Sequence, residues 1–148
     1  MTKRFFHRIS RYFNISREER VLFSRALFLL VVWKAKIVFL PMPAYVKYFG
    51  EKGVELNFPA EGNEVFIKKV QLSIRRADSV LPWKSKCLTE AIATKRMLEF
   101  RKIKSTLLLG VAKDEKEKLI AHAWLILGNR IISGERGHEK FTVVQKFS

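Results

Sequence analysis

The stretch PWKSKCLTEAIATKR, from Pro82 to Arg96, contains the only cysteine of the 148-residue chain. A helix is predicted from Cys87 to about Arg101, because apolar residues recur at helical spacing and form one buried face: Leu88, Ala91, Ile92 and Leu98. Cys87 then falls in the first turn, between basic residues. Unpaired N–H groups and the helix dipole favour a thiolate there. The position suits a nucleophile, and a buried cysteine that only packs is the alternative.

Two helices are predicted before this stretch. The sequence SREE is a capping box, in which Ser16 accepts from the backbone N–H of Glu19 and the Glu19 carboxylate accepts from the backbone of Ser16. The pattern predicts a helix from about Arg17 to Leu40, which ends before Pro41. A second helix is predicted over Val65 to Ser79, where apolar residues also recur at helical spacing.

After the cysteine helix the pattern changes to strands. Four strands are predicted: Ser105 to Val111, Leu119 to Leu127, Arg130 to Ser133, and Lys140 to Val144. Helices followed by an antiparallel meander indicate an α+β fold, with the cysteine helix packed on the sheet. We divide the chain into a basic helical region, residues 1–64, and a core, residues 65–148.

His122 lies between alanines in an apolar strand, where it could serve as general base for Cys87, with a structural histidine as the alternative. Gly128 and Asn129 predict a two-residue hairpin turn. Such a turn sets these pairs opposite each other: Leu127 with Arg130, Trp124 with Ser133, and His122 with Glu135. The last pair would have Cβ atoms about 5 Å apart, so the Glu135 carboxylate could orient the imidazole.

Composition excludes several classes of protein. One cysteine forms no internal disulfide, which indicates a reduced, cytoplasmic location. The histidines and the cysteine lack metal-ligand spacing, and the glycines form no phosphate-binding loop, so we expect neither metal nor cofactor. A net charge of +15 suggests an anionic partner, but the basic residues form no nucleic-acid-binding module. We expect an acidic peptide or a membrane surface instead.

The apolar run from Ala26 to Trp33 is shorter than the roughly 20 residues that a membrane span needs. Lys34 and Lys36 follow it directly, where the centre of a bilayer would lie. Three alternatives stay open for this helix: packing in the core of the protein, docking of a partner, or peripheral contact with a membrane surface.

Four motifs together resemble one known family. They are LPWKSKCLTEAIATKRML, LLLGVAKD, LIAHAWLIL and GERGHEKFTVV, in this order. They resemble the stand-alone leader peptidase of lasso peptide biosynthesis, a branch of the transglutaminase-like cysteine proteases. The resemblance covers roughly Val70 to the C-terminus. The Trp-x-x-x-Cys-Leu pattern with a downstream His-Ala-Trp is specific as a combination, and each piece alone is weak.

The resemblance implies a papain/transglutaminase-like core with Cys87 as nucleophile and His122 as base. It implies hydrolysis of one peptide bond, which frees the core of a ribosomally made precursor from its leader peptide. The implied partners are a small leader-recognition protein and an ATP-dependent macrolactam synthetase. Family members often carry an aspartate about a dozen residues after the histidine. Three alternatives stay open here: Glu135 substitutes for the aspartate, Asn129 orients the ring, or Cys87 and His122 act as a dyad.

Overall fold

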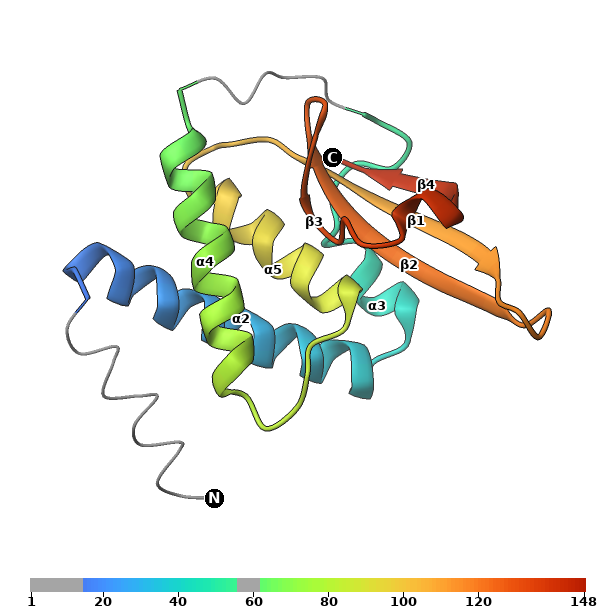
Figure 1. The fold of residues 1–148 in the computed structure, drawn as a ribbon, viewed down its shortest axis with the longest axis horizontal. Helices are drawn as coiled ribbons and strands as arrows, with labels where there is room; N and C mark the ends of the chain where they lie inside the picture. The colour runs from blue at the N-terminus through green and yellow to red at the C-terminus, as the bar shows by residue number, and fades with distance from the viewer. Residues whose placement is uncertain (1–14, 56–61) are drawn as a thin grey trace.

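The computed structural model describes residues 15–55 and 62–148. Its elements are the helices α2 (Arg17–Phe39), α3 (Met42–Val46), α4 (Glu64–Val80) and α5 (Cys87–Glu99), the strands β1 (Thr106–Lys113), β2 (Leu119–Leu127), β3 (Arg130–Ser133) and β4 (Thr142–Phe147), and the short 3-10 helix η1 (His138–Lys140). The larger helices gather on one side of the molecule and the sheet lies on the other (Figure 1). The α+β class predicted from the sequence is confirmed.

Helix α2 begins with the predicted capping box. The Ser16 hydroxyl accepts from the Glu19 backbone N–H at 3.3 Å, and the Ser16 N–H donates to the Glu19 carboxylate at 3.3 Å. The helix ends at Phe39, and Leu40 is extended. An extended residue is what the following Pro41 favours, because a proline restricts the residue before it.

One face of α2 packs in the protein's own core. Leu22, Ala26, Leu30 and Trp33 are buried there, in one continuous cluster that also includes residues of α4, α5 and the sheet. Packing in the core, the first of the three alternatives for this helix, therefore holds for this face. Within the described ranges, no helix combines the length and the apolar character that crossing a membrane requires.

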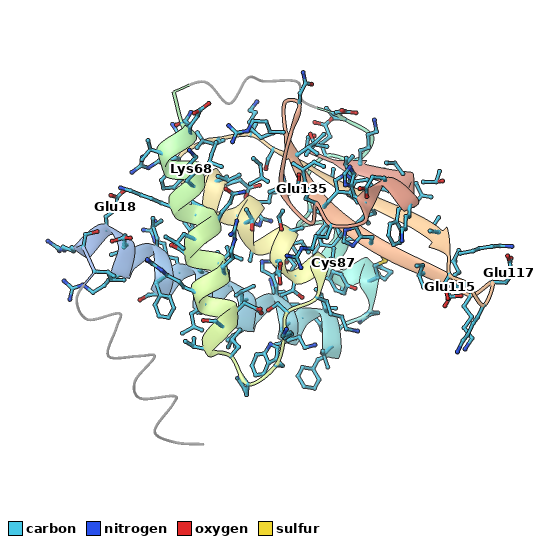
Figure 2. All side chains as sticks on the ribbon, viewed as in Figure 1. Glu18, Lys68, Cys87, Glu115, Glu117 and Glu135 are labelled. Carbon is cyan, nitrogen blue, oxygen red and sulfur yellow. The ribbon has the colours of Figure 1, made fainter. Side chains whose placement is uncertain are left out.

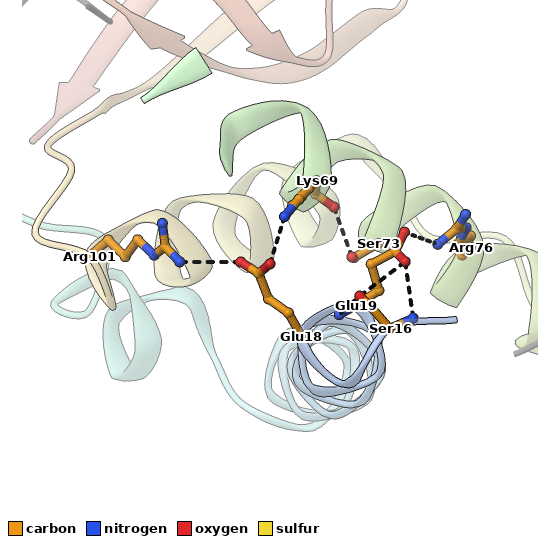
Figure 3. A network of polar contacts seen from close by, with 7 residues as sticks. All are labelled: Ser16, Glu18, Glu19, Lys69, Ser73, Arg76 and Arg101. Atoms are coloured by element: carbon orange, nitrogen blue, oxygen red, sulfur yellow. Dashed lines mark hydrogen bonds and ion pairs between the residues drawn. The ribbon is translucent and has the colours of Figure 1, made fainter. Parts of the chain in front are cut away.

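Ion pairs connect α2 to the two helices above it (Figure 3). Glu18 accepts from Lys69 of α4 at 2.6 Å and from Arg101, just after α5, at 3.3 Å. Glu19 accepts from Arg76 of α4 at 3.2 Å. The first turn of α2 thus contacts both neighbours through carboxylates, while the rest of its inner face contacts them through apolar side chains.

Helix α5 is buried on most of its surface and packs on β2. Its buried residues are Thr89, Ala91, Ile92, Ala93, Thr94, Lys95, Met97 and Leu98. Lys95 is 4% exposed, and its ammonium donates to the Ser105 carbonyl at 2.8 Å. Burial lowers the pKa of this lysine. The cysteine helix therefore packs on an antiparallel sheet, as the sequence predicts.

The sheet is antiparallel but is not the predicted meander. Its strand order is β3-β2-β1-β4. The last strand, β4, therefore pairs with β1 and not with β3, its neighbour in the chain. Three hairpin-connected strands with a fourth beside the first make a Greek key. The last strand also starts later than predicted and continues to Phe147, which is buried against the ring of Phe49 at a centroid distance of 5.3 Å. This long-range aromatic contact explains why the strand extends beyond Val144.

We expect the ion pairs of α2 to make the fold sensitive to acid. Hydrogen bonds from Lys69 and Arg76 hold the pKa of Glu18 and of Glu19, respectively, below the ordinary value of 4.5. A lowered pKa stabilises the folded state above the ordinary value, and this contribution is lost as the pH falls through the folded pKa. Glu19→Gln should lower the urea midpoint at neutral pH and reduce the loss of stability on acidification to about pH 3.

Glutamine can still accept and donate in a capping box, so Glu19→Gln mainly removes the charge. Glu115→Gln, in the exposed turn between β1 and β2, makes the same charge change away from α2. This variant should leave the urea midpoint at neutral pH and the loss of stability on acidification unchanged. Equal effects of the two variants would mean that net charge, and not the ion pair with Arg76, sets the acid sensitivity.

Candidate active site

Cys87 is the first residue of α5 and is half-buried. Lys86, which precedes it, is extended, with φ −83° and ψ 157°, and its side chain does not cap the helix. The first intrahelical bond is from the Glu90 N–H to the Lys86 carbonyl, at 3.1 Å. The N–H groups of the first turn therefore have no intrahelical acceptor, and they can stabilise a thiolate or an oxyanion.

A cavity of about 550 Å³ opens at this end of α5. Its wall is formed by α4, α5, β2, β3 and the loop that follows β3. The three predicted site residues, Cys87, His122 and Glu135, all line it. Figure 2 shows Cys87 and Glu135 on the same part of the molecule, where α5 meets the loop after β3. The fold brings together residues that are far apart in the sequence.

His122 has a defined set of contacts. Its Nε2 lies 2.8 Å from the carbonyl oxygen of Gly134. Its ring packs against Trp124 and Phe141, with centroid distances of 5.8 Å and 5.0 Å. Because a carbonyl oxygen can only accept, Nε2 must carry the proton in this bond. Nδ1 of the neutral ring is then the basic nitrogen.

The register predicted for β2 and β3 is wrong beyond the turn. Leu127 pairs with Arg130 as expected, but Ser133 pairs with Leu125 and not with Trp124. A bulge between Leu125 and Ile126 accounts for this difference, because one extra residue of β3 is accommodated there. The predicted pairing of His122 with Glu135 depended on an uninterrupted register, and the bulge interrupts it. The group that meets the imidazole is the backbone carbonyl of Gly134.

Of the candidates for a third catalytic residue, the structure places only Glu135 in the cavity. Glu135 is an exposed residue of its lining, and a role for its carboxylate there stays a prediction. Asn129 lies in the β2–β3 turn and is not part of the lining. The Gly134 carbonyl was missed because a backbone oxygen leaves no signal in the residue type.

Gly110 makes room for the aromatic residues around His122. It pairs with His122 across β1 and β2. A Cβ at this position would lie 2.7 Å from the Trp124 ring and 2.9 Å from the Cβ of Phe141. Any side chain here would displace the residues that hold the imidazole, so the absence of a Cβ contributes to the geometry of the site.

Glu90 also lines the cavity and was not identified from the sequence. Burial, and to a lesser extent the negative charge of Asp78, raises the pKa of its carboxyl to about 7. The signal was present, because residues three apart on a helix share a face and Glu90 follows Cys87 by three. What the sequence did not indicate was that this face lines a cavity.

We expect neutral His122 to carry its proton on Nε2, which nitrogen NMR of labelled histidine can measure. Gly134→Ala should disturb this tautomer, because the backbone φ is +78° and the new Cβ would lie 2.5 Å from the Ala123 carbonyl oxygen. Gly137→Ala is the matched control, since its φ is +74° but nothing lies within 4 Å of its Cβ. If Glu135→Gln changed the tautomer and Gly134→Ala did not, the carboxylate would orient the ring.

One of three comparisons with known proteins found a match. A protein-family model described as the transglutaminase-like superfamily matches residues 54–146, which is more than half of the chain and includes Cys87, His122 and Glu135. Neither the curated proteins nor the solved structures contain a significant match. On the strength of the family match, the chain belongs to the transglutaminase-like superfamily.

Proposed function

We propose that the protein is a cysteine endopeptidase that removes the leader peptide from a ribosomally synthesised lasso peptide precursor. The observation that carries the proposal is that the thiol of Cys87, at an uncapped helix start, lines the same cavity as His122. Members of the transglutaminase-like superfamily commonly act as cysteine proteases or acyl transferases. The lasso peptide precursor is inferred from the resemblance of the four sequence motifs.

In the proposed reaction, Nδ1 of His122 accepts the thiol proton, and the Cys87 thiolate attacks the carbonyl carbon of the scissile bond. First-turn N–H groups of α5 stabilise the oxyanion. The imidazolium then protonates the leaving amine, which leaves as the new N-terminus of the core peptide. A water molecule, deprotonated by His122, hydrolyses the thioester. The bond from Nε2 to the Gly134 carbonyl supports the imidazolium throughout.

A specific surface favours a partner. The outer face of α2, opposite its buried face, includes several exposed apolar residues: Val21, Phe28, Val31, Val38 and Phe39. Phe39 is 82% exposed and Phe28 is 67% exposed. Exposed basic residues, Arg17 and Arg20, lie on the same helix. We propose that this outer face docks the small leader-recognition protein with its bound leader, and that the ATP-dependent macrolactam synthetase then acts on the released core.

Two alternatives use the same features. A non-catalytic binding subunit would hold an acidic leader or a membrane surface through the outer face of α2. An acyl transferase would use the Cys87 thiol and pass the acyl group to an acceptor other than water. Incubation with a purified precursor separates the three, because they give cleavage, binding without cleavage, or a new amide or ester product.

Cys87→Ser and Cys87→Ala should abolish cleavage of the precursor, because no other thiol exists in the chain. His122→Ala should lower turnover by about the same factor, since the residues act as a unit. Mass spectrometry of the products measures cleavage, and circular dichroism shows whether the variants remain folded. Full activity of a folded Cys87→Ala protein would refute the peptidase proposal.

Phe28→Asp and Phe39→Asp should weaken binding of the recognition protein by about tenfold or more, if these residues are central to the interface. Affinity should also fall as salt rises, because ions screen exposed charges. Titration calorimetry measures both effects. Leu119→Asp is the matched control, since Leu119 is 74% exposed but lies on β2. Unchanged affinity in both α2 variants would reject the surface, and binding to anionic vesicles alone would indicate a membrane contact.

A further inference from the structure

Within the described part of the chain, a carboxyl group in the wall of the cavity has no partner. Glu90 lies one turn after Cys87 on α5 and is partly buried. Among the described residues, none forms a hydrogen bond or an ion pair with its carboxylate; Thr94 bonds only to its backbone carbonyl, at 2.7 Å. A buried carboxyl group usually has a partner, because transferring an unpaired charge from water is costly.

The charged and titratable groups around Glu90 do not neutralise it. They are Arg75 and Asp78 from α4, Cys87 from α5, His122 from β2, and Glu135 and Arg136 from the loop after β3. Arg75 and Arg136 are exposed residues of the lining, and neither lowers the pKa of the Glu90 carboxyl. Burial raises the pKa of the Glu90 carboxyl, and the negative charge of Asp78 raises it further. A cation beside Glu90 would offset both effects.

Glu90 lies close to the nucleophile because it follows Cys87 by three residues on α5. Residues three apart on a helix have Cβ atoms about 5–6 Å apart and point to the same side. A substrate whose carbonyl carbon is at the Cys87 sulfur therefore has its adjacent side chain within reach of Glu90. Thr94 lies one turn further along α5 and also lines the cavity. Its hydroxyl donates a hydrogen bond to the Glu90 backbone carbonyl.

We propose that Glu90 forms a subsite for a positively charged side chain, lysine or arginine, at the residue whose carbonyl Cys87 attacks. The proposal rests on the peptidase function for its substrate, but the charge preference of the cavity does not depend on cleavage. Ionised Glu90 attracts the cation and pairs with it, whereas protonated Glu90 does not. Preference for a cation should therefore increase as the pH rises through about 7.

Reaction of Cys87 with charged methanethiosulfonates tests the subsite without a peptide. The thiolate attacks the thiol-derived sulfur, a mixed disulfide forms, and methanesulfinate leaves with the bonding electron pair. We compare the rate for the trimethylammonium-ethyl reagent with the rate for the sulfonatoethyl reagent by intact mass. Their ratio cancels the thiolate fraction, and the single cysteine makes the modified residue unambiguous.

In the wild type, the cation-to-anion ratio should rise between about pH 6 and about pH 8, as a carboxyl group titrates. Glu90→Gln should remove most of this rise and lower the ratio at the higher pH by about tenfold. Any contribution of His122 remains in the variant and is subtracted. Glu115→Gln is the matched control, because Glu115 lies far from Cys87, at the β1–β2 turn (Figure 2), and it should behave as the wild type.

A ratio that is the same in the wild type and in Glu90→Gln over the whole pH range would overturn the subsite. A second measurement uses precursor variants with lysine or norleucine before the scissile bond. The wild type should cleave the lysine form with a kcat/KM about tenfold higher, and Glu90→Gln should not. Cleavage of both forms at equal rates overturns the subsite alone. A shifted reagent ratio without any cleavage supports the subsite and rejects the peptidase.

Discussion

Burial of α5 between two helices and a sheet is the constraint on which the rest of the structure depends. Small residues, Ala91 and Ala93, are fully buried on it and allow close approach by its neighbours. Leu98 and Met97 fill the remaining space without exposure. A helix held on several sides cannot shift along its axis without opening cavities, which cost about 2–5 kcal/mol for each large side chain that loses its packing. The start of α5 is therefore fixed relative to β2.

Helix α2 contributes to this constraint. Helix α2 packs against both α4 and α5, and its buried Trp33 packs against Phe49, whose ring in turn meets Phe147 of β4. Aromatic contacts thus connect α2 to β4. The chain carries an excess of basic residues, yet the acidic residues at the start of α2 each meet a cation. Specific pairing and apolar burial hold together a chain whose net charge of +15 opposes compaction.

The cavity contains the groups that the core leaves unpaired. The first turn of α5 has no side-chain cap, and His122 forms a hydrogen bond through Nε2. Among the residues that the structure describes, none pairs with the Glu90 carboxyl group or with Nδ1 of His122. Such groups destabilise a fold unless a ligand or solvent satisfies them, and they gather at functional sites. The electrostatics also differ along one helix face, since the helix start favours an anion at Cys87 while the position one turn later favours a cation beside Glu90.

The amino-acid sequence by itself determined the local elements, and it also predicted the type of chemistry. The capping box at Ser16, the periodicity before and after Cys87, and the Gly128–Asn129 turn are all recorded in neighbouring residues, because capping, amphipathic spacing and turn geometry act over a few positions. A cysteine at a helix start and a histidine in an apolar strand also follow from local pattern, and they indicate a thiol nucleophile with its base.

Only the tertiary structure decided what surrounds these residues. The register shift at Leu125 places the Gly134 carbonyl, and not Glu135, beside His122. Strand β4 pairs with β1 and not with β3. Glu90 acquires its raised pKa because a helix face that could have been solvated lines a cavity instead. These outcomes depend on packing between residues distant in the chain, and a bulge or a crossover changes the packing without changing any local pattern.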